Sequence, residues 1–119
     1  IAGQIKEIDD MPMNKVFAET EPARREIDTL PGAIMIEFGA PWCGHCQGAQ
    51  PLIEAAFASD PPLQHIKIED GPGRPLGRSF RVKLWPTLVF MKDGQEICRL
   101  VRPGDAEAIV EAIRGITGE

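Results

Sequence analysis

The chain has 119 residues, with 13 basic and 18 acidic side chains, a formal net charge of −5 and 43% hydrophobic residues. This composition predicts one globular domain over residues 1–119 and excludes a collagen, a coiled coil or a disordered chain. The acidic balance provides no basic surface for nucleic acid. The longest largely apolar run, Leu84 to Met91, is too short for a membrane span of about 20 residues, so we expect neither nucleic acid nor membrane as a partner.

The first half of the chain predicts alternating strands and helices. Weak alternation over Gln4–Ile8 favours a short edge strand. Apolar residues at loose helical spacing favour a helix over Asn14–Thr29, interrupted by Pro22. The nearly all-apolar run Ala33–Gly39 is typical of a buried central strand. A second helix is expected from Cys43 to about Ser59.

The second half predicts three more strands and a closing helix. Leu63–Glu69 alternates as a strand does, and Arg74–Phe80 is expected to be a short helix or irregular segment. Pro86–Met91 predicts a strand, joined by a tight Asp-Gly turn to a return strand over Glu96–Val101. Asp105 is expected to cap a final amphipathic helix.

The order of these elements defines the expected fold class. Alternation of strands and helices favours parallel strands joined by right-handed crossovers, and the final hairpin adds an antiparallel edge. We therefore predict an α/β domain with a central mixed sheet and helices on both faces.

The chemistry is expected at a Cys-x-x-Cys pair. The chain has only three cysteines, which does not describe a disulfide scaffold. Cys43 and Cys46 follow a predicted buried strand and open a helix, whose N-terminal N–H groups and dipole favour a thiolate over a thiol. We expect Cys43 to be the more exposed nucleophile that attacks a substrate disulfide. Cys46, one turn later and shielded, would then resolve the mixed disulfide.

The two histidines and the third cysteine bear on thiolate tuning and on metal binding. His45 is expected to favour the thiolate of Cys43, with a solvated loop histidine as the alternative. A structural zinc or iron–sulfur site usually needs two such pairs, and the only further candidates here are His45, His65 and Cys98, so we expect no metal. Cys98 is expected to fill space in a strand, with a regulatory thiol as the alternative.

Several motifs together resemble the thioredoxin superfamily, over roughly residues 4–117. The stretch Glu37–Cys46 is very similar to the active-site stretch of protein disulfide isomerase domains, and Trp42 matches the tryptophan before the first cysteine. Pro51 falls where family members carry a helix-kinking proline. Trp85–Thr87 matches the cis-proline loop, which in the family lies opposite the cysteines. The resemblance implies a thioredoxin-like fold.

The resemblance also implies a proton acceptor. Glu37 stands where the family keeps a buried acid, and burial is expected to raise the pKa of this carboxyl. Glu37 would then take the proton of Cys46 near neutral pH. Lys67 stands where the family places a partner lysine. For both residues the alternative is a surface charge at a strand end.

A substrate surface follows from the same resemblance. We expect Trp42, Gly44, Trp85 and Pro86 to bind substrate, with Pro86 in cis and the Trp85 backbone pairing with an extended substrate strand. Three residues depart from the family pattern. Trp85 is larger than usual, Gly39 replaces a common aromatic residue, and Arg102 replaces a common glycine. Gly39 and Arg102 are both expected to change the rim where substrates dock.

The sequence therefore predicts a thiol–disulfide oxidoreductase that acts on protein disulfides through a Cys43–Cys46 dithiol. The favoured role is a thioredoxin-like reductant in cell redox homeostasis, in which the dithiol carries the electrons and no cofactor is bound. Two alternatives stay open. One is an oxidase or isomerase in an oxidising compartment, and the other is a non-catalytic peptide-binding module.

Compartment and partners follow from the same expectation. The chain begins Ile1–Gln4 without the pattern of a signal peptide, which favours the cytoplasm. A periplasmic or secretory compartment would apply if a signal peptide had been removed. We expect a monomer that is recharged by a reductase or another electron donor.

Overall fold

The structure is a computed structural model that describes residues 13–118. The edge strand expected over Gln4–Ile8 lies outside these residues. In chain order the elements are α2 (Arg24–Asp28), β1 (Ala33–Gly39), α3 (Gly44–Ala56), β2 (Gln64–Glu69), α4 (Pro75–Ser79), β3 (Thr87–Lys92), β4 (Gln95–Val101) and α5 (Ala106–Thr117). No helix within the described range is long and apolar enough to cross a membrane.

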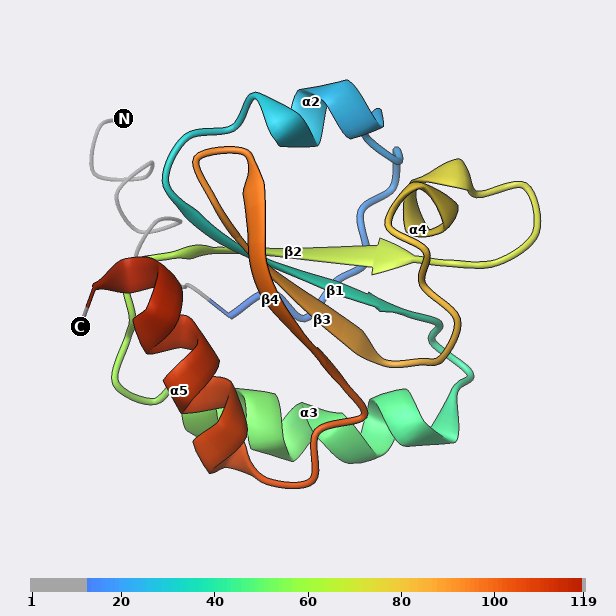
Figure 1. The fold of residues 1–119 in the computed structure, drawn as a ribbon. Helices are drawn as coiled ribbons and strands as arrows, with labels where there is room; N and C mark the ends of the chain where they lie inside the picture. The colour runs from blue at the N-terminus through green and yellow to red at the C-terminus, as the bar shows by residue number, and fades with distance from the viewer. Residues whose placement is uncertain (1–12, 119) are drawn as a thin grey trace, which may run out of the picture.

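The described strands form one mixed sheet in the order β2-β1-β3-β4 (Figure 1). β1 is parallel to β2, whereas β3 is antiparallel to both β1 and β4. The mixed sheet was predicted correctly, but the parallel crossover through the second half was not. α4 has only five residues, too few to carry the chain back along the sheet, so β3 starts at the end where β2 finishes.

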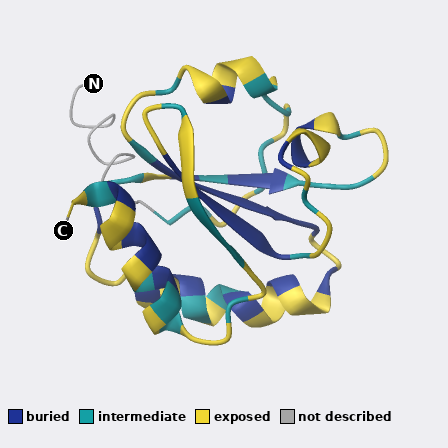
Figure 2. Cartoon of the chain, in the orientation of Figure 1, coloured by how far each residue is buried: buried dark blue, intermediate teal, exposed yellow. Residues whose placement is uncertain are grey.

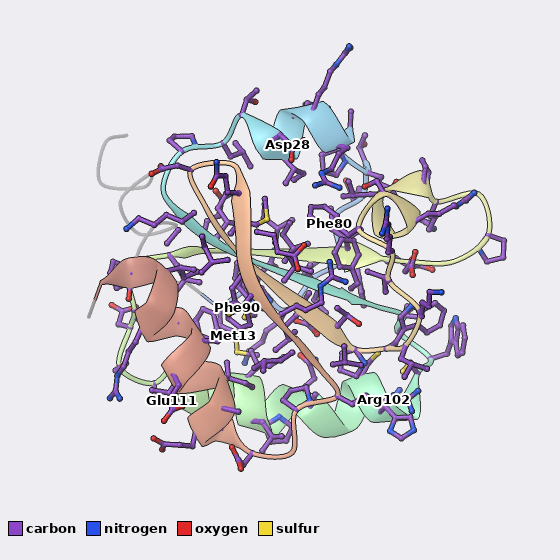
Figure 3. All side chains as sticks on the ribbon, viewed as in Figure 1. Met13, Asp28, Phe80, Phe90, Arg102 and Glu111 are labelled. Atoms are coloured by element: carbon purple, nitrogen blue, oxygen red, sulfur yellow. The ribbon has the colours of Figure 1, made fainter. Side chains whose placement is uncertain are left out.

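Helices cover both faces of the sheet, as expected. α3 and α5 lie on one face, and α2 and α4 lie on the other (Figure 1). Each face has its own core: Phe90 packs in the cluster beneath α3 and α5, and Phe80 packs in the cluster beside α4 (Figure 3). β1 and β3 are buried along most of their lengths, while the helices keep exposed outer faces (Figure 2). The site-bearing strand β1 is therefore held rigidly from both sides.

The helix predicted over Asn14–Thr29 is mostly wrong. Only α2 forms, and it starts after Pro22, whose ring and missing N–H prevent a continuous helix. The segment before it makes other bonds: the backbone N–H of Ala18 donates to the carbonyl of Lys67 at 2.9 Å. Tertiary contacts with β2 thus replace the hydrogen bonds that a helix would have supplied.

The other elements match the expectation within a few residues. β1 spans the predicted range, and α3 begins directly after Cys43 but ends at Ala56, before the expected Ser59. Asp105 caps α5, with its carboxylate accepting from the N–H of Ala108 at 2.9 Å.

The hairpin glycine Gly94 offers a test of the packing between the hairpin and α2. Gly94 has a left-handed φ of +83°, and an added Cβ would overlap the backbone carbonyl oxygen of Asp28. We expect Gly94→Ala to lower the free energy of unfolding by about 2–4 kcal/mol, because it adds a backbone clash to the strain of the positive φ. Urea denaturation measures this loss.

Gly32 provides the matched control. Its φ is +80°, and nothing lies within 4 Å of an added Cβ. Gly32→Ala should therefore cost only the backbone strain, about 1 kcal/mol. Equal losses in the two variants would contradict a specific clash at Gly94.

Candidate active site

A strand, a short loop and a helix start position the two cysteines. β1 ends at Gly39, and Cys43 is the N-cap of α3, with extended backbone at φ −83° and ψ 119°. The Cys43 sulfur accepts a hydrogen bond from the backbone N–H of Cys46 at 3.2 Å. Cys43 therefore lies at the positive end of the helix, with its sulfur next to free backbone N–H groups.

Cys43 and Cys46 differ little in burial. Cys43 is 7% exposed and Cys46 is 4% exposed. The expected contrast between an exposed and a shielded cysteine is therefore small, because Trp85 packs against the cluster that both form with Ala40. Access to Cys43 thus depends on how a substrate meets the Trp85 loop.

Cys46 is strongly biased toward its neutral thiol. Burial raises the pKa of Cys46 to about 12, and the hydrogen bond with Cys43 and the negative charge of Glu37 act in the same direction. Because a neutral thiol is a poor nucleophile, Cys46 needs a base before it can attack a disulfide.

A buried polar cluster lies behind the cysteines, on the side of the sheet covered by α3. Glu37 on β1 is 1% exposed, and its Oε1 lies 2.9 Å from Nε2 of His65 on β2. Its Oε2 accepts from Nε2 of Gln50 at 2.8 Å and lies 3.6 Å from Nζ of Lys67. Gln50 also donates to the backbone carbonyl of Cys46 at 3.1 Å, so it links the acid to the second cysteine.

His65 is held in one orientation by the N-terminal segment. The backbone N–H of Asn14 donates to Nδ1 of His65 at 2.8 Å, so Nδ1 is an acceptor and Nε2 is the nitrogen that donates to Glu37. Every polar atom of the Glu37 carboxylate therefore has a donor, which is the condition for keeping a carboxylate ionised in a buried site.

The expected rise in the Glu37 pKa is wrong. Burial is the largest influence and does raise the pKa of Glu37, but the hydrogen bonds from His65 and Gln50 and the positive charge of Lys67 together bring it below its ordinary value. Sequence reasoning considered His65 only as a metal ligand. Its spacing two residues before Lys67 in a strand, which puts both side chains on one face, was the available signal.

The tryptophans and the proline loop form the face beside Cys43. The Trp85–Pro86 peptide bond is cis. The Trp42 ring is 71% exposed and meets the Trp85 ring edge-on, with centroids 5.4 Å apart. Trp85 is anchored by Asp70, whose carboxylate accepts from Nε1 at 2.9 Å. The predicted substrate-binding residues thus gather on one surface.

An open groove of about 580 Å³ runs from this surface along the start of α3. We call it the α3 groove. Its lining includes Gly44, His45, Leu52, Pro86 and Arg102. The exposed position of His45 is suited to contact with substrate, and its role in tuning Cys43 stays a prediction.

Gly39 lies next to the Cys46 sulfur and not on the surface where substrates dock. Gly39 is buried, and an added Cβ would lie 2.6 Å from the Cys46 sulfur, so its expected place on the docking rim is wrong. The missing side chain leaves space for the Cys46 thiol.

Cys98 is half-buried in β4 against the core below α5, and burial together with the Glu96 carboxylate raises the pKa of its thiol.

The site combines two cysteines at the start of a helix, a cis-proline loop beside them and a buried acid behind them. Together these parts define the class of thiol–disulfide oxidoreductases. The family model described as Thioredoxin matches residues 6–115. The chain belongs to the thioredoxin family.

Known proteins similar to this chain fall into two groups. Thioredoxin from Chlamydia trachomatis is 35% identical over 83 residues, which cover 69% of this chain and 80% of that protein. Protein disulfide-isomerase A2 from Pongo abelii is 37% identical over 92 residues, which cover 72% of this chain but 18% of that protein. The chain spans only 18% to 24% of the disulfide-isomerases that it matches.

Solved structures agree with the family. The structure of thioredoxin 2 from Pseudomonas aeruginosa PAO1 in its reduced form is 53% identical, with a TM-score of 0.79, and the match covers 89% of this chain and 98% of that one. The structure of Fasciola hepatica thioredoxin is 27% identical with a TM-score of 0.63, over 77% of this chain and 86% of that one.

Proposed function

We propose that the protein is a reductant of protein disulfides, working through Cys43 and Cys46. The observation that carries this direction is the likeness to thioredoxin 2 from Pseudomonas aeruginosa, which is 53% identical and is matched over 98% of its length.

The proposed cycle transfers two electrons. The Cys43 thiolate attacks a substrate disulfide, forming a mixed disulfide and releasing one substrate thiolate, which takes a proton from solvent. The ionised Glu37 carboxylate takes the proton of Cys46 as the Cys46 sulfur attacks the Cys43 sulfur, so no free Cys46 thiolate forms, and Glu37 then releases this proton to solvent. The second substrate thiolate leaves and is protonated, which leaves Cys43 and Cys46 oxidised and the substrate reduced. A reductase or another two-electron donor restores the dithiol.

The reduction potential of the Cys43–Cys46 pair against glutathione buffers tests the direction. We expect a value of about −270 mV, the range of a thioredoxin-like reductant. This range also fits the reducing cytoplasm, which we propose as the compartment. A Cys43→Ser variant should show no transition in the same buffers and serves as the control.

Two other outcomes would replace the proposal. A potential at or above roughly −180 mV would indicate an oxidase or isomerase. If no disulfide formed between Cys43 and Cys46 in any buffer, the enzyme class itself would fail. A peptide-binding module would then be the remaining function.

A further inference from the structure

Arg102 occupies the proline loop in an unusual way. It follows the end of β4 with a left-handed φ of 51°. Its backbone N–H donates to the carbonyl of Pro86 at 2.9 Å, and its side-chain Nε donates to the carbonyl of Trp85 at 2.8 Å. A single residue thus binds two consecutive carbonyls of the loop beside the cysteines.

This contact changes what the loop offers to a substrate. An extended peptide that adds to a backbone edge needs both donors and acceptors there. Arg102 occupies one of the two lone pairs of the Trp85 carbonyl oxygen. The guanidinium adds N–H donors beside this oxygen, since its remaining nitrogens make no ion pair within the described part of the chain. The loop therefore presents charged donors next to its backbone acceptor.

The surroundings of Arg102 favour a negative partner. Arg102 is exposed and lines the α3 groove with His45 (Figure 3 shows the Arg102 side chain near the start of α3). The first turn of α3 holds no acidic residue. Asp105, the acidic residue nearest in sequence, uses its carboxylate to cap α5. In a chain of net charge −5, this groove presents a local positive charge along the start of α3, the helix that Cys43 caps.

We propose that Arg102 makes the α3 groove a subsite for a carboxylate, so that the protein prefers substrate segments with Asp or Glu beside the reactive cysteine. The inference rests on the proposed function, the reduction of protein disulfides. It assigns Arg102 to substrate selection, and the chemistry stays with Cys43 and Cys46. The apolar floor of the groove at Leu52 and Pro86 would receive the neighbouring aliphatic part of the segment.

Matched peptide disulfides test the preference. The peptides differ only in the residue next to the cysteine, which is Glu, Gln or Lys, and carry a fluorophore that is released on reduction. Pre-reduced protein is mixed with each peptide, and the second-order rate constant is measured in a single turnover. We expect the Glu peptide to react about two- to fivefold faster than the Gln peptide, the upper part of the range for an exposed charge pair, and the Lys peptide to be slowest. High salt should reduce the differences in rate constant between the three peptides.

Two arginine variants separate the groove from general charge. Arg102→Gly should bring the Glu/Gln ratio close to one, and glycine suits the left-handed backbone at this position. Arg81→Gly is the matched control, because Arg81 is also exposed with a left-handed φ of 58° but does not line the groove. It should keep the preference of the unaltered protein.

The outcomes distinguish the two proposals. Equal rates for all three peptides, or a preference that persists in Arg102→Gly, would overturn the carboxylate subsite and leave the proposed function standing. Failure to reduce any of the peptides would overturn the proposed function and the subsite with it.

Discussion

Replacing Cys46 with serine is expected to turn the protein from a catalyst into a trap for its substrates. Cys43 keeps its place at the start of α3 and can still attack a disulfide, but no second sulfur is present to release the adduct. Mixed disulfides should accumulate through Cys43, and multiple turnover should be lost. Non-reducing electrophoresis and mass spectrometry of the linked peptides measure both effects.

Two further cysteine variants make the trapping result specific. Cys43→Ser should form no adduct, because the remaining Cys46 thiol is buried and strongly disfavours its thiolate. Adding Cys98→Ser to the Cys46→Ser variant should leave trapping intact, since Cys98 lies in β4 away from the motif. Adducts that map to Cys98, or no adducts with reducible proteins at all, would contradict the assignment of Cys43 as nucleophile.

Replacing Glu37 with glutamine is expected to slow the resolution of the mixed disulfide by about a hundredfold at neutral pH, the usual contribution of a positioned general base. The first attack by Cys43 should change much less, since Cys43 does not depend on Glu37 for its proton. Stopped-flow and rapid-quench measurements separate the two steps. In the variant the resolution rate should rise steadily with pH, as hydroxide takes over the removal of the Cys46 proton.

The direction of the Glu37 pKa shift fixes its pH dependence. Because the folded protein holds the pKa of Glu37 below its ordinary value of 4.5, the carboxylate is ionised across the neutral range. Its contribution to stability is fully present above the unfolded pKa and is lost as pH falls through the folded value. The native protein should therefore lose stability in acid more steeply than Glu37→Gln. Glu54→Gln, an exposed change on α3, is the control. It should change neither the loss of stability in acid nor the rate of resolution.

Equal slowing of both chemical steps in Glu37→Gln would contradict its role as proton acceptor. Such a result would mean that the substitution disturbs the site through packing. Glu37 bonds to three side chains, so thermal unfolding of the variant must be measured beside its kinetics.

The sequence predicted best where a single local pattern dominates. The nearly all-apolar run Ala33–Gly39 is typical of a buried strand, and a Cys-x-x-Cys pair one short loop after it placed the sulfurs at a helix start. The helix over Asn14–Thr29 failed because its spacing was loose and β2 offered other partners. The direction of β3 failed because element order does not report how far a connection travels along the sheet.

The sequence predicted which residues form the candidate site better than it predicted their ionisation. Glu37 and Lys67 do meet, but the ionisation of a buried acid depends on every donor around it. His65 and Gln50 come from two different elements, and neither is marked by a motif. The sign of the Glu37 shift therefore required three-dimensional contacts, as did the use of the Trp85 carbonyl by Arg102.

The segment from Asn14 to Ala18, which is hydrogen-bonded to β2, also affects whether the sheet can pair with other chains. β2 is an edge strand of the described sheet, and an open edge is a template for pairing with a strand of another molecule. The carbonyls of His65 and Lys67 on this strand accept from the Asn14 side chain at 3.4 Å and the Ala18 backbone at 2.9 Å. The segment that orients His65 toward the buried acid therefore also removes the acceptors that intermolecular β-pairing needs, and protects this edge against aggregation.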